Sequence, residues 1–384
     1  MERGEKTVKK VVSFVTVFIM AFSLISSVKI NAQEVSVSVP SAILIEKNTG
    51  MVIYEKNADE AMKPASVTKI MTILLIMESI KDGQFGYDDI VTASAYATSM
   101  GGSQVYLKEG EQMSVDEMLK CIIVASANDA CVAMAEFVSG SVEAFVSQMN
   151  EKAKDLGMKN TNFVNCTGLE AQGHLTTARD ISIMSRELLG YDDVKKYTTV
   201  WMDSIRNGEF GLTNTNKLIR FYDGATGLKT GYTSQSKYCI SATAQKNGME
   251  LIAVVMAAES SDQRNADAKA LLNYGFARYK YYKPTDIKLE PVKIIKGKKE
   301  SVTPVLKEDF GALIEKDSEK NIECKINLCA DVHAPVEKTQ KLGEAVLFCD
   351  GKEISKTDII CPERVEKKSF ADIFLELLNY FLII

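Results

Sequence analysis

Residues 70–77 are apolar at nearly every position, which is the pattern of a helix buried on all sides. The run is too short to cross a bilayer. Pro64 stands shortly before it, and because proline is favoured at helix starts, we expect the helix to begin near Ser66. Lys69, three residues further on, then lies on the same face as Ser66 in the first turn.

Strand patterns flank a largely helical middle. Residues 41–45 and 51–54 predict a hairpin, and residues 237–245 and 250–257 predict a second one around the tight turn Asn247-Gly248. Between them the helix-start signals are Ser114, Ser141 and Thr176, and a closing helix covers 261–279. The polar, glycine-containing stretch 82–111 is interpreted as loops beside the Ser66 pocket, or else as a surface excursion. We therefore expect an α+β domain over residues 33–282, an antiparallel sheet flanked by helices with an all-helical part.

The pattern changes after Pro284. Short β-like runs separated by charged turns predict a small β-rich domain over residues 283–365. Residues 366–384 predict an amphipathic helix, with Asp372, Glu376 and Asn379 on one face and apolar side chains on the other. We interpret this helix as an in-plane membrane anchor flanked by Lys367 and Lys368. The alternative is a helix docked on the protein itself.

The first residues have the pattern of an export signal. Residues 1–32 combine a basic start, an apolar stretch over 11–25 and a tolerable cleavage site ending at Ala32. An uncleaved membrane anchor is the alternative. In both cases the rest of the chain is expected outside the cytoplasm.

Composition narrows the function classes. Among the 384 residues the formal net charge is −5, which argues against a nucleic-acid partner. Eight cysteines without a C-x-x-C pair, and only two histidines, argue against a metal site, and we expect no cofactor. Most cysteines are interpreted as small core residues. The last four (324, 329, 349 and 361) leave a disulfide open, which an exported protein permits.

Ser66 and Lys69 carry the first chemical hypothesis. A serine hydroxyl is a weak nucleophile until a base takes its proton, and a lysine whose pKa is lowered by burial can be that base. Free N–H groups at the helix start can stabilise an oxyanion. The S-x-x-K spacing alone is not specific, because it recurs at Ser234/Lys237 and Ser26/Lys29.

Two further polar segments accompany this pair. Ser126-Ala127-Asn128 interrupts two apolar helices, where polar groups need partners; the alternative is a simple helix break capped by Ser126 or Asn128. Lys229-Thr230-Gly231 falls where we expect the chain to enter a strand, and Gly231 leaves room for a ligand against the backbone. A surface turn is the alternative for this triplet.

The motifs S-x-x-K, S-x-N and K-T-G occur in that order, and this set is found in penicillin-binding proteins and class A β-lactamases. The chain resembles a low-molecular-mass penicillin-binding protein of the serine-type D-alanyl-D-alanine carboxypeptidase family. The resemblance covers the signal, a β-lactamase/transpeptidase-like domain, a β-rich domain and the terminal helix. Two departures are Ala127, where glycine or aspartate is usual, and Tyr232 after the K-T-G.

The resemblance implies a role for each motif residue. Ser66 attacks the carbonyl of the penultimate D-alanine and becomes acylated, and Lys69 takes its proton. Ser126 relays a proton to the leaving amine with help from Lys229. Asn128 holds the amide backbone of the substrate and Lys69.

The resemblance also implies how the substrate is bound. Lys229, Thr230 and Arg264 attract the terminal carboxylate, although Arg264 has the alternative of a solvated arginine at a helix start. Gly231 and Tyr232 line the peptide, and the backbone N–H groups of Ser66 and Tyr232 form the oxyanion hole.

The implied partners are the peptidoglycan pentapeptide stem, β-lactam antibiotics as acylating inhibitors, and the outer face of the cytoplasmic membrane through the C-terminal helix. A β-lactamase is disfavoured because no E-x-x-L-N stretch lies between the second and third motifs; Glu170 stands in Gly-Leu-Glu-Ala-Gln. A DD-endopeptidase on the same site stays open, since the motifs do not exclude it. A wall-binding protein with a degenerate site is disfavoured because every motif residue is present.

Overall fold

The computed structural model describes residues 35–382 apart from residue 309. Its central element is a five-stranded sheet with the order β2-β1-β9-β8-β7 and antiparallel neighbours throughout. Its strands are β1 (Ser41–Glu46), β2 (Val52–Lys56), β7 (Ala225–Thr233), β8 (Lys237–Lys246) and β9 (Met249–Ala258). Both predicted hairpins are confirmed, and Asn247 and Gly248 take the positive φ values of 51° and 78° that a tight turn requires. Because β1 pairs with β9, the two ends of this part of the chain meet in one sheet.

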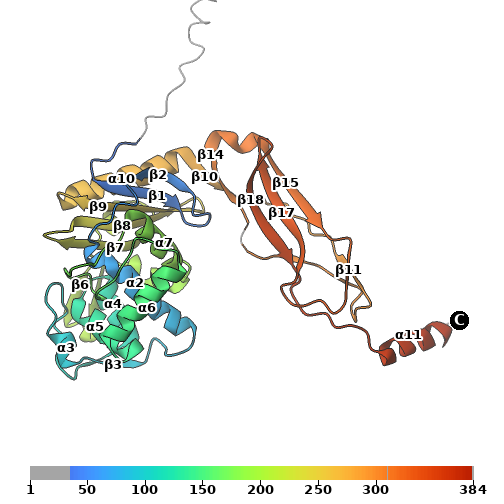
Figure 1. Cartoon of the computed structure of the whole chain (residues 1–384), viewed down its shortest axis with the longest axis horizontal. Coiled ribbons are helices and arrows are strands. Elements are labelled where there is room, and N and C mark those ends of the chain that lie inside the picture. Colours follow the sequence, from blue (N-terminus) through green and yellow to red (C-terminus); the bar gives the residue numbers. More distant parts are fainter. Residues whose placement is uncertain (1–34, 309, 383–384) are drawn as a thin grey trace, which may run out of the picture. The chain divides into compact units, whose positions relative to one another are not determined.

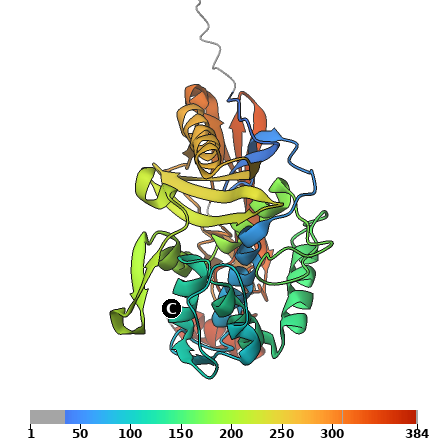
Figure 2. The same cartoon turned by 90° about the vertical axis from the view of Figure 1, so that its left-hand side faces the viewer.

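Helices cover both faces of this sheet. α10 (Ser261–Arg278) packs on β9 and β8, and α7 (Ala178–Leu188) packs on β9 and β1 from the other side (Figure 1). As a result β1 and β9 are buried along almost their whole length. Figure 2 shows the helical part gathered beneath the sheet.

The predicted buried helix is confirmed as α2 (Lys69–Lys81), which contributes apolar side chains to the main core from every side. Its start differs from the expectation. Ser66 belongs to a separate 3-10 turn, η1 (Ala65–Thr68), and α2 proper begins at Lys69. Ala65 opens this turn with a φ of +48°, so the chain bends sharply into the helix.

Local capping explains where the surrounding helices begin. The side-chain oxygens of Ser114, Ser141 and Thr177 accept hydrogen bonds from backbone N–H groups in the first turns that follow. The helices of this part are α3 (Ala95–Thr98), α4 (Val115–Ile123), α5 (Asn128–Ser139), α6 (Val142–Asp155), α8 (Lys195–Thr198) and α9 (Leu218–Phe221), with 3-10 turns η2 (Asp192–Val194) and η3 (Arg206–Gly208). Two small hairpins pair β3 (Ile90–Thr92) with β4 (Gln112–Ser114) and β5 (Met202–Ile205) with β6 (Phe210–Thr213).

The region after α10 is rich in short strands. β10 (Tyr279–Tyr282) pairs with β14 (Ala312–Glu315), so a strand that the expected boundary at 282 placed in the first domain hydrogen-bonds with the second. The remaining elements are β11 (Val292–Ile295), β12 (Ser301–Val302), β13 (Val305–Leu306), η4 (Lys316–Asn321), β15 (Ile322–Leu328), β16 (Asp331–His333), β17 (Lys341–Cys349) and β18 (Lys352–Ile360). Two small apolar clusters form their cores.

The last described element is α11 (Phe370–Leu382), in the segment where an amphipathic helix was expected. Among the described residues, no single helix has both the length and the apolarity of a membrane span; the bent pair α5 and α6 reaches them only jointly. All eight cysteines are free thiols. The expected signal segment, residues 1–32, and the last two residues of the chain lie outside the described part.

Candidate active site

Lys69 is the centre of the candidate site. Its side chain is fully buried, and its Nζ donates hydrogen bonds to Ser66 Oγ (3.1 Å), Asn128 Oδ1 (2.6 Å) and the Thr167 carbonyl (2.7 Å). Burial lowers the pKa of the Lys69 amine from its ordinary value, although the nearby Cys131, Cys166 and Asp129 oppose this shift. A lysine held this way is poised to accept the proton of the Ser66 hydroxyl.

The Ser126–Asn128 segment forms one wall of the site. Ser126 has a φ of +63° in the break between α4 and α5, and Asn128 is the first residue of α5. The N-cap of α5 is Ala127, without a side-chain cap, so neither Ser126 nor Asn128 serves the capping role that was the alternative. Asn128 Nδ2 instead donates to the Gly101 carbonyl (2.7 Å), which turns Oδ1 toward Lys69.

The K-T-G triplet forms the facing wall. Lys229 lies in the middle of β7, at the edge of the sheet, and not at the strand entry where it was expected. Its buried Nζ donates to Ser126 Oγ (2.8 Å) and to the Thr230 carbonyl (3.1 Å). Burial, together with the positive charges of Lys69 and Arg264, holds the pKa of Lys229 well below its ordinary value. The two walls are therefore joined through a lysine and a serine hydroxyl.

Gly231 explains how closely β7 approaches the Ser66 turn. A Cβ on this residue would lie 2.8 Å from the Pro64 carbonyl oxygen and 3.0 Å from the Ser66 backbone nitrogen. A side chain at this position would therefore push β7 away from Ser66. Glycine lets the backbone of β7 lie directly against the backbone of Ser66.

The remaining predicted site residues lie along β7 and α10. Thr230 Oγ1 donates to Thr215 Oγ1 (2.7 Å), and Tyr232 is 56% exposed. The Arg264 side chain is buried; its guanidinium lies 6.0 Å from the Tyr238 ring, and its Nε and Nη2 donate to Asn265 Oδ1 at 3.2 and 3.0 Å. Burial lowers the pKa of Arg264, and its charge in turn acts on Lys229. Arg264 is therefore not the solvated arginine that was the alternative.

Sequence reasoning missed several groups that hold the site. The carbonyls of Thr167, Gly101 and Ser103 bind Lys69 and Asn128, and the Thr215 hydroxyl binds Thr230. Backbone carbonyls leave no sequence signal, because every residue has one. A polar run such as Asn214-Thr215-Asn216, all three of whose side chains are hydrogen-bonded, is a signal that buried partners exist.

His174 was also missed as a support of the Ser66 turn. Its Nδ1 accepts a hydrogen bond from the Val164 N–H (3.0 Å), so its Nε2 carries the proton and donates to Thr68 Oγ1 in η1 (2.8 Å). Burial lowers the pKa of His174 to about 4. The imidazole is therefore neutral, and its two hydrogen bonds hold in place the η1 turn that contains Ser66.

The second S-x-x-K pair lacks these features. Ser234 and Lys237 are exposed, and Lys237 Nζ pairs with Glu259 Oε2 at 3.1 Å. Glu170, the one glutamate weighed as a β-lactamase base, accepts a hydrogen bond from the Gln235 N–H (3.1 Å). Its carboxylate is thus engaged by the turn after β7, while Lys69 is bound by Ser66, Asn128 and Thr167.

This arrangement provides the parts needed for acyl transfer. The Ser66 hydroxyl is bound to a buried amine, a second amine-bound hydroxyl lies at Ser126, and Lys229 and Arg264 supply positive charge without a carboxylate partner among the described residues. An anionic peptide end is the ligand that this set favours, because a bound carboxylate raises the pKa of Lys229 again and keeps its amine protonated beside Arg264.

Comparison with known proteins agrees with this geometry. Residues 28–260 match the family of D-alanyl-D-alanine carboxypeptidases, peptidase family S11, and residues 276–367 match the C-terminal domain of penicillin-binding protein 5. The chain is 45% identical over 337 residues to the D-alanyl-D-alanine carboxypeptidase DacF of Bacillus subtilis (strain 168), covering 86% of each chain. It is 33% identical to DacA of Escherichia coli (strain K12), over 86% of this chain and 84% of that protein.

Solved structures show the same fold. Penicillin-binding protein 5 of Haemophilus influenzae superposes with a TM-score of 0.73 at 29% identity, over 86% of this chain and 98% of that one. Penicillin-binding protein D2 of Listeria monocytogenes, solved in an ampicillin-bound form, has a TM-score of 0.58 at 29% identity, over 62% and 98% of the two chains. Both the expected transpeptidase-like fold and the family resemblance are confirmed. The chain belongs to the S11 family of D-alanyl-D-alanine carboxypeptidases.

Proposed function

We propose that this protein is a serine-type D-alanyl-D-alanine carboxypeptidase that removes the terminal D-alanine from peptidoglycan pentapeptide stems through an acyl-enzyme on Ser66. The observation that carries this proposal is the position of Lys69 Nζ, which binds Ser66 Oγ at 3.1 Å and Asn128 Oδ1 at 2.6 Å in a buried pocket. A buried amine in this position is a base, and the hydroxyl it binds is the nucleophile.

Acylation begins when Ser66 Oγ attacks the carbonyl carbon of the penultimate D-alanine and its proton passes to Lys69 Nζ. The backbone N–H groups of Ser66 and Tyr232, on the facing segments that Gly231 brings together, stabilise the resulting oxyanion. The C–N bond then breaks, and the departing amine takes a proton through Ser126 Oγ, which Lys229 Nζ binds. Free D-alanine leaves, and an ester remains on Ser66.

Deacylation reverses the same transfers with water as the nucleophile. A water molecule gives its proton through Ser126 Oγ to Lys229 Nζ and attacks the ester carbonyl. The C–O bond breaks, and Lys69 Nζ returns its proton to Ser66 Oγ. The products are the shortened stem peptide and the regenerated hydroxyl.

Substrate selection follows from charge. We place the terminal carboxylate at Lys229 and the Thr230 hydroxyl, where the charge of the buried Arg264 guanidinium also acts. Fixed cations in a site with little water bind a carboxylate more strongly than they do at a surface. A stem that has already lost its last residue places its carboxylate in the wrong position, so the enzyme acts once on each stem.

A β-lactam enters the same sequence of steps. Its strained amide is opened by Ser66, but the amine that is released stays tethered to the acyl group. Because it does not diffuse away as D-alanine does, the acyl-enzyme persists. Penicillins are therefore expected to be acylating inhibitors of this protein.

The experiment that tests the carboxypeptidase activity is mass spectrometry of pentapeptide incubated with the purified protein. Loss of one alanine with no cut elsewhere is the expected result. A protein that releases no alanine, or that only opens a β-lactam ring rapidly, contradicts the proposal. A parallel reaction with cross-linked dimeric peptide tests for DD-endopeptidase activity. Cleavage of the cross-link would identify that activity.

We infer further that the protein is exported and held at the outer face of the cytoplasmic membrane by α11. The pattern of residues 1–32 supports export. On α11, Phe370, Phe374, Leu375 and Leu377 are each more than half exposed, and an apolar helix face left open to solvent is what membrane attachment would cover. The wall polymer that is the substrate lies on that side of the membrane.

A further inference from the structure

The carbonyls of Gly101 and Ser103 bind Asn128, and the loop that continues from these two residues presents the exposed aromatic ring of Tyr106. Tyr106 is 69% exposed, whereas its neighbours Val105 and Leu107 are buried. Its φ is +56°, a conformation that residues with a side chain rarely adopt. The fold therefore holds a bulky residue in an unfavourable backbone conformation in order to point its ring outward, and such outliers cluster at functional sites.

Asp129 fixes the loop from one side. The carboxylate of this buried residue accepts hydrogen bonds from the N–H groups of Val105 (3.1 Å) and Leu107 (3.0 Å), on either side of Tyr106. Asp129 directly follows Asn128 in the first turn of α5. The two side chains therefore extend from one helix end, Asn128 toward Lys69 and Asp129 toward the loop.

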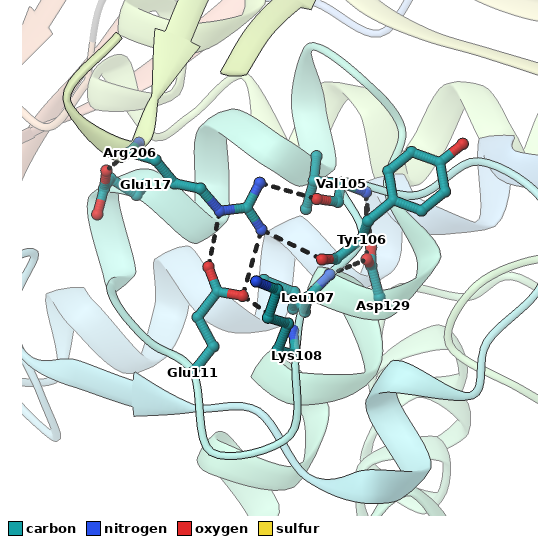
Figure 3. Close-up of polar contacts among 8 residues, drawn as sticks. All are labelled: Val105, Tyr106, Leu107, Lys108, Glu111, Glu117, Asp129 and Arg206. Atoms are coloured by element: carbon teal, nitrogen blue, oxygen red, sulfur yellow. Dashed lines mark hydrogen bonds and ion pairs between the residues drawn. The ribbon is translucent and has the colours of Figure 1, made fainter. Parts of the chain in front are cut away.

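Arg206 fixes the same loop from the other side. Its Nη1 and Nη2 donate to the carbonyls of Val105 (3.0 Å) and Tyr106 (3.4 Å), and its Nε is held by Glu111 Oε1 (2.7 Å) (Figure 3). The Tyr106 ring also meets Phe210 edge-on, with 6.3 Å between the ring centroids. Figure 3 shows this ring projecting away from the hydrogen-bond network, with its hydroxyl at the outer end. These contacts leave most of the side chain open to solvent.

The position of Tyr106 relates it to the substrate. Ser103, whose carbonyl accepts the Asn128 N–H at 2.7 Å, is three residues away, a span of at most about 10 Å. A five-residue stem in extended form is about 17 Å long. With the last two residues at Ser66 and β7, the other three residues of the stem extend over about 10 Å. This length is similar to the span from Ser103 to Tyr106.

We propose that the exposed face of Tyr106 binds the N-acetylated amino sugar of the glycan strand that carries the stem peptide. A pyranose presents a face of C–H groups that stacks on an aromatic ring, and the 69% exposure of Tyr106 leaves its side chain open to such a ligand. Asp129 and Arg206 are positioning residues for this contact. The inference rests on the proposed function, because it extends the substrate from the stem to the sugar.

The test compares two substrates that differ only in the sugar: free pentapeptide and disaccharide-pentapeptide. Tyr106→Ala should lower kcat/KM for the disaccharide-pentapeptide about 5- to 10-fold, because KM rises. The value of kcat/KM for the free pentapeptide should stay within about twofold of wild type. Tyr106→Phe should behave as wild type, because it keeps the ring. Tyr96→Ala removes another exposed tyrosine, which lies outside this loop, and should change kcat/KM for neither substrate.

A second arm does not depend on turnover. Titration of Ser66→Ala and of Ser66→Ala/Tyr106→Ala with disaccharide-pentapeptide gives the ratio of their Kd values, expected to be about 5 to 10. Equal losses on both substrates, or no loss on either, would overturn the sugar contact. Failure of the carboxypeptidase proposal is a separate result: wild type would release no D-alanine, while the Kd ratio still decides the role of Tyr106.

Arg206→Met tests the positioning. Loss of the guanidinium should raise KM for the disaccharide-pentapeptide and leave its kcat nearly unchanged. Both constants for the free pentapeptide should stay close to wild type. A general loss of folding would instead lower the melting temperature and reduce turnover of both substrates. An unchanged KM for the disaccharide-pentapeptide would remove Arg206 from the proposal.

Discussion

Lys229 Nζ donates a hydrogen bond to Ser126 Oγ over 2.8 Å, although 103 residues separate them in the chain. This bond joins the edge strand β7 to the break between α4 and α5 across the site. It also gives the Ser126 hydroxyl a defined direction, because the acceptor lone pair used by Lys229 leaves its own proton free to point into the pocket.

Replacing Ser126 with alanine should therefore impair departure of the amine. The expected loss in kcat/KM for D-alanine release is about 10²- to 10⁴-fold, the usual contribution of a positioned proton donor. Ser103→Ala is the matched control, since Ser103 contributes its carbonyl and not its hydroxyl to the same wall. Turnover by Ser126→Ala within a few-fold of wild type would contradict the relay.

Gly231→Ala should separate β7 from the Ser66 turn. The new Cβ would lie 2.8 Å from a backbone oxygen that cannot rotate away, and overpacking of this kind costs about 1–3 kcal/mol. We expect slower acylation by penicillin, by tenfold or more, and a lower free energy of unfolding in urea. Gly211→Ala provides the comparison, because a Cβ there meets no atom within 4 Å. Similar behaviour of the two variants would rule out the close approach.

Periodicity and turn chemistry predicted much of this fold. The apolar run after Lys69 correctly predicted the buried helix α2, and Asn247-Gly248 correctly predicted the β8–β9 hairpin. Both signals are local in the sequence. The sequence predicts Lys229 at a strand entry, whereas it lies within β7. Glycine and lysine have low strand propensity. Pairing with β8 along its whole length overrides that propensity.

The site was predictable only where side chains form a pattern. Ser66, Lys69, Ser126, Asn128 and Lys229 occur in short motifs, and the structure brings all of them together. The Thr167 carbonyl was not predictable, because its role depends on the tertiary position of a backbone atom. The role of His174 depends in the same way on Thr68, which is 106 residues away.

His174 predicts a pH dependence of stability. Its pKa falls from 6.5 to about 4 on folding because of burial, so the unfolded chain binds the proton more tightly. The contribution of the neutral His174 to the free energy of unfolding is fully present above pH 6.5. It is lost as the pH drops toward 4, by about 3 kcal/mol in total. Urea unfolding at several pH values should show this loss in wild type and a smaller loss in His174→Asn. Equal slopes for the two proteins would contradict the assignment.

Deletion of residues 369–384 should release the signal-processed protein from membranes, because it removes the exposed apolar face of α11. Sedimentation with phospholipid vesicles measures this directly. Phe374→Glu, on the apolar face, should weaken binding, whereas Asp372→Asn, on the polar face, should not. A truncated protein that still sediments would show that another part of the chain binds the membrane.

The chain offers a direct test of the nucleophile, because it contains a second S-x-x-K pair that is exposed and whose lysine is paired with Glu259. Intact-mass measurement after incubation with penicillin should show one added acyl group on wild type and on Ser234→Ala, and none on Ser66→Ala. Peptide mapping should place that group on Ser66. Acylation that persists in Ser66→Ala, or that maps to any other residue, would contradict the account.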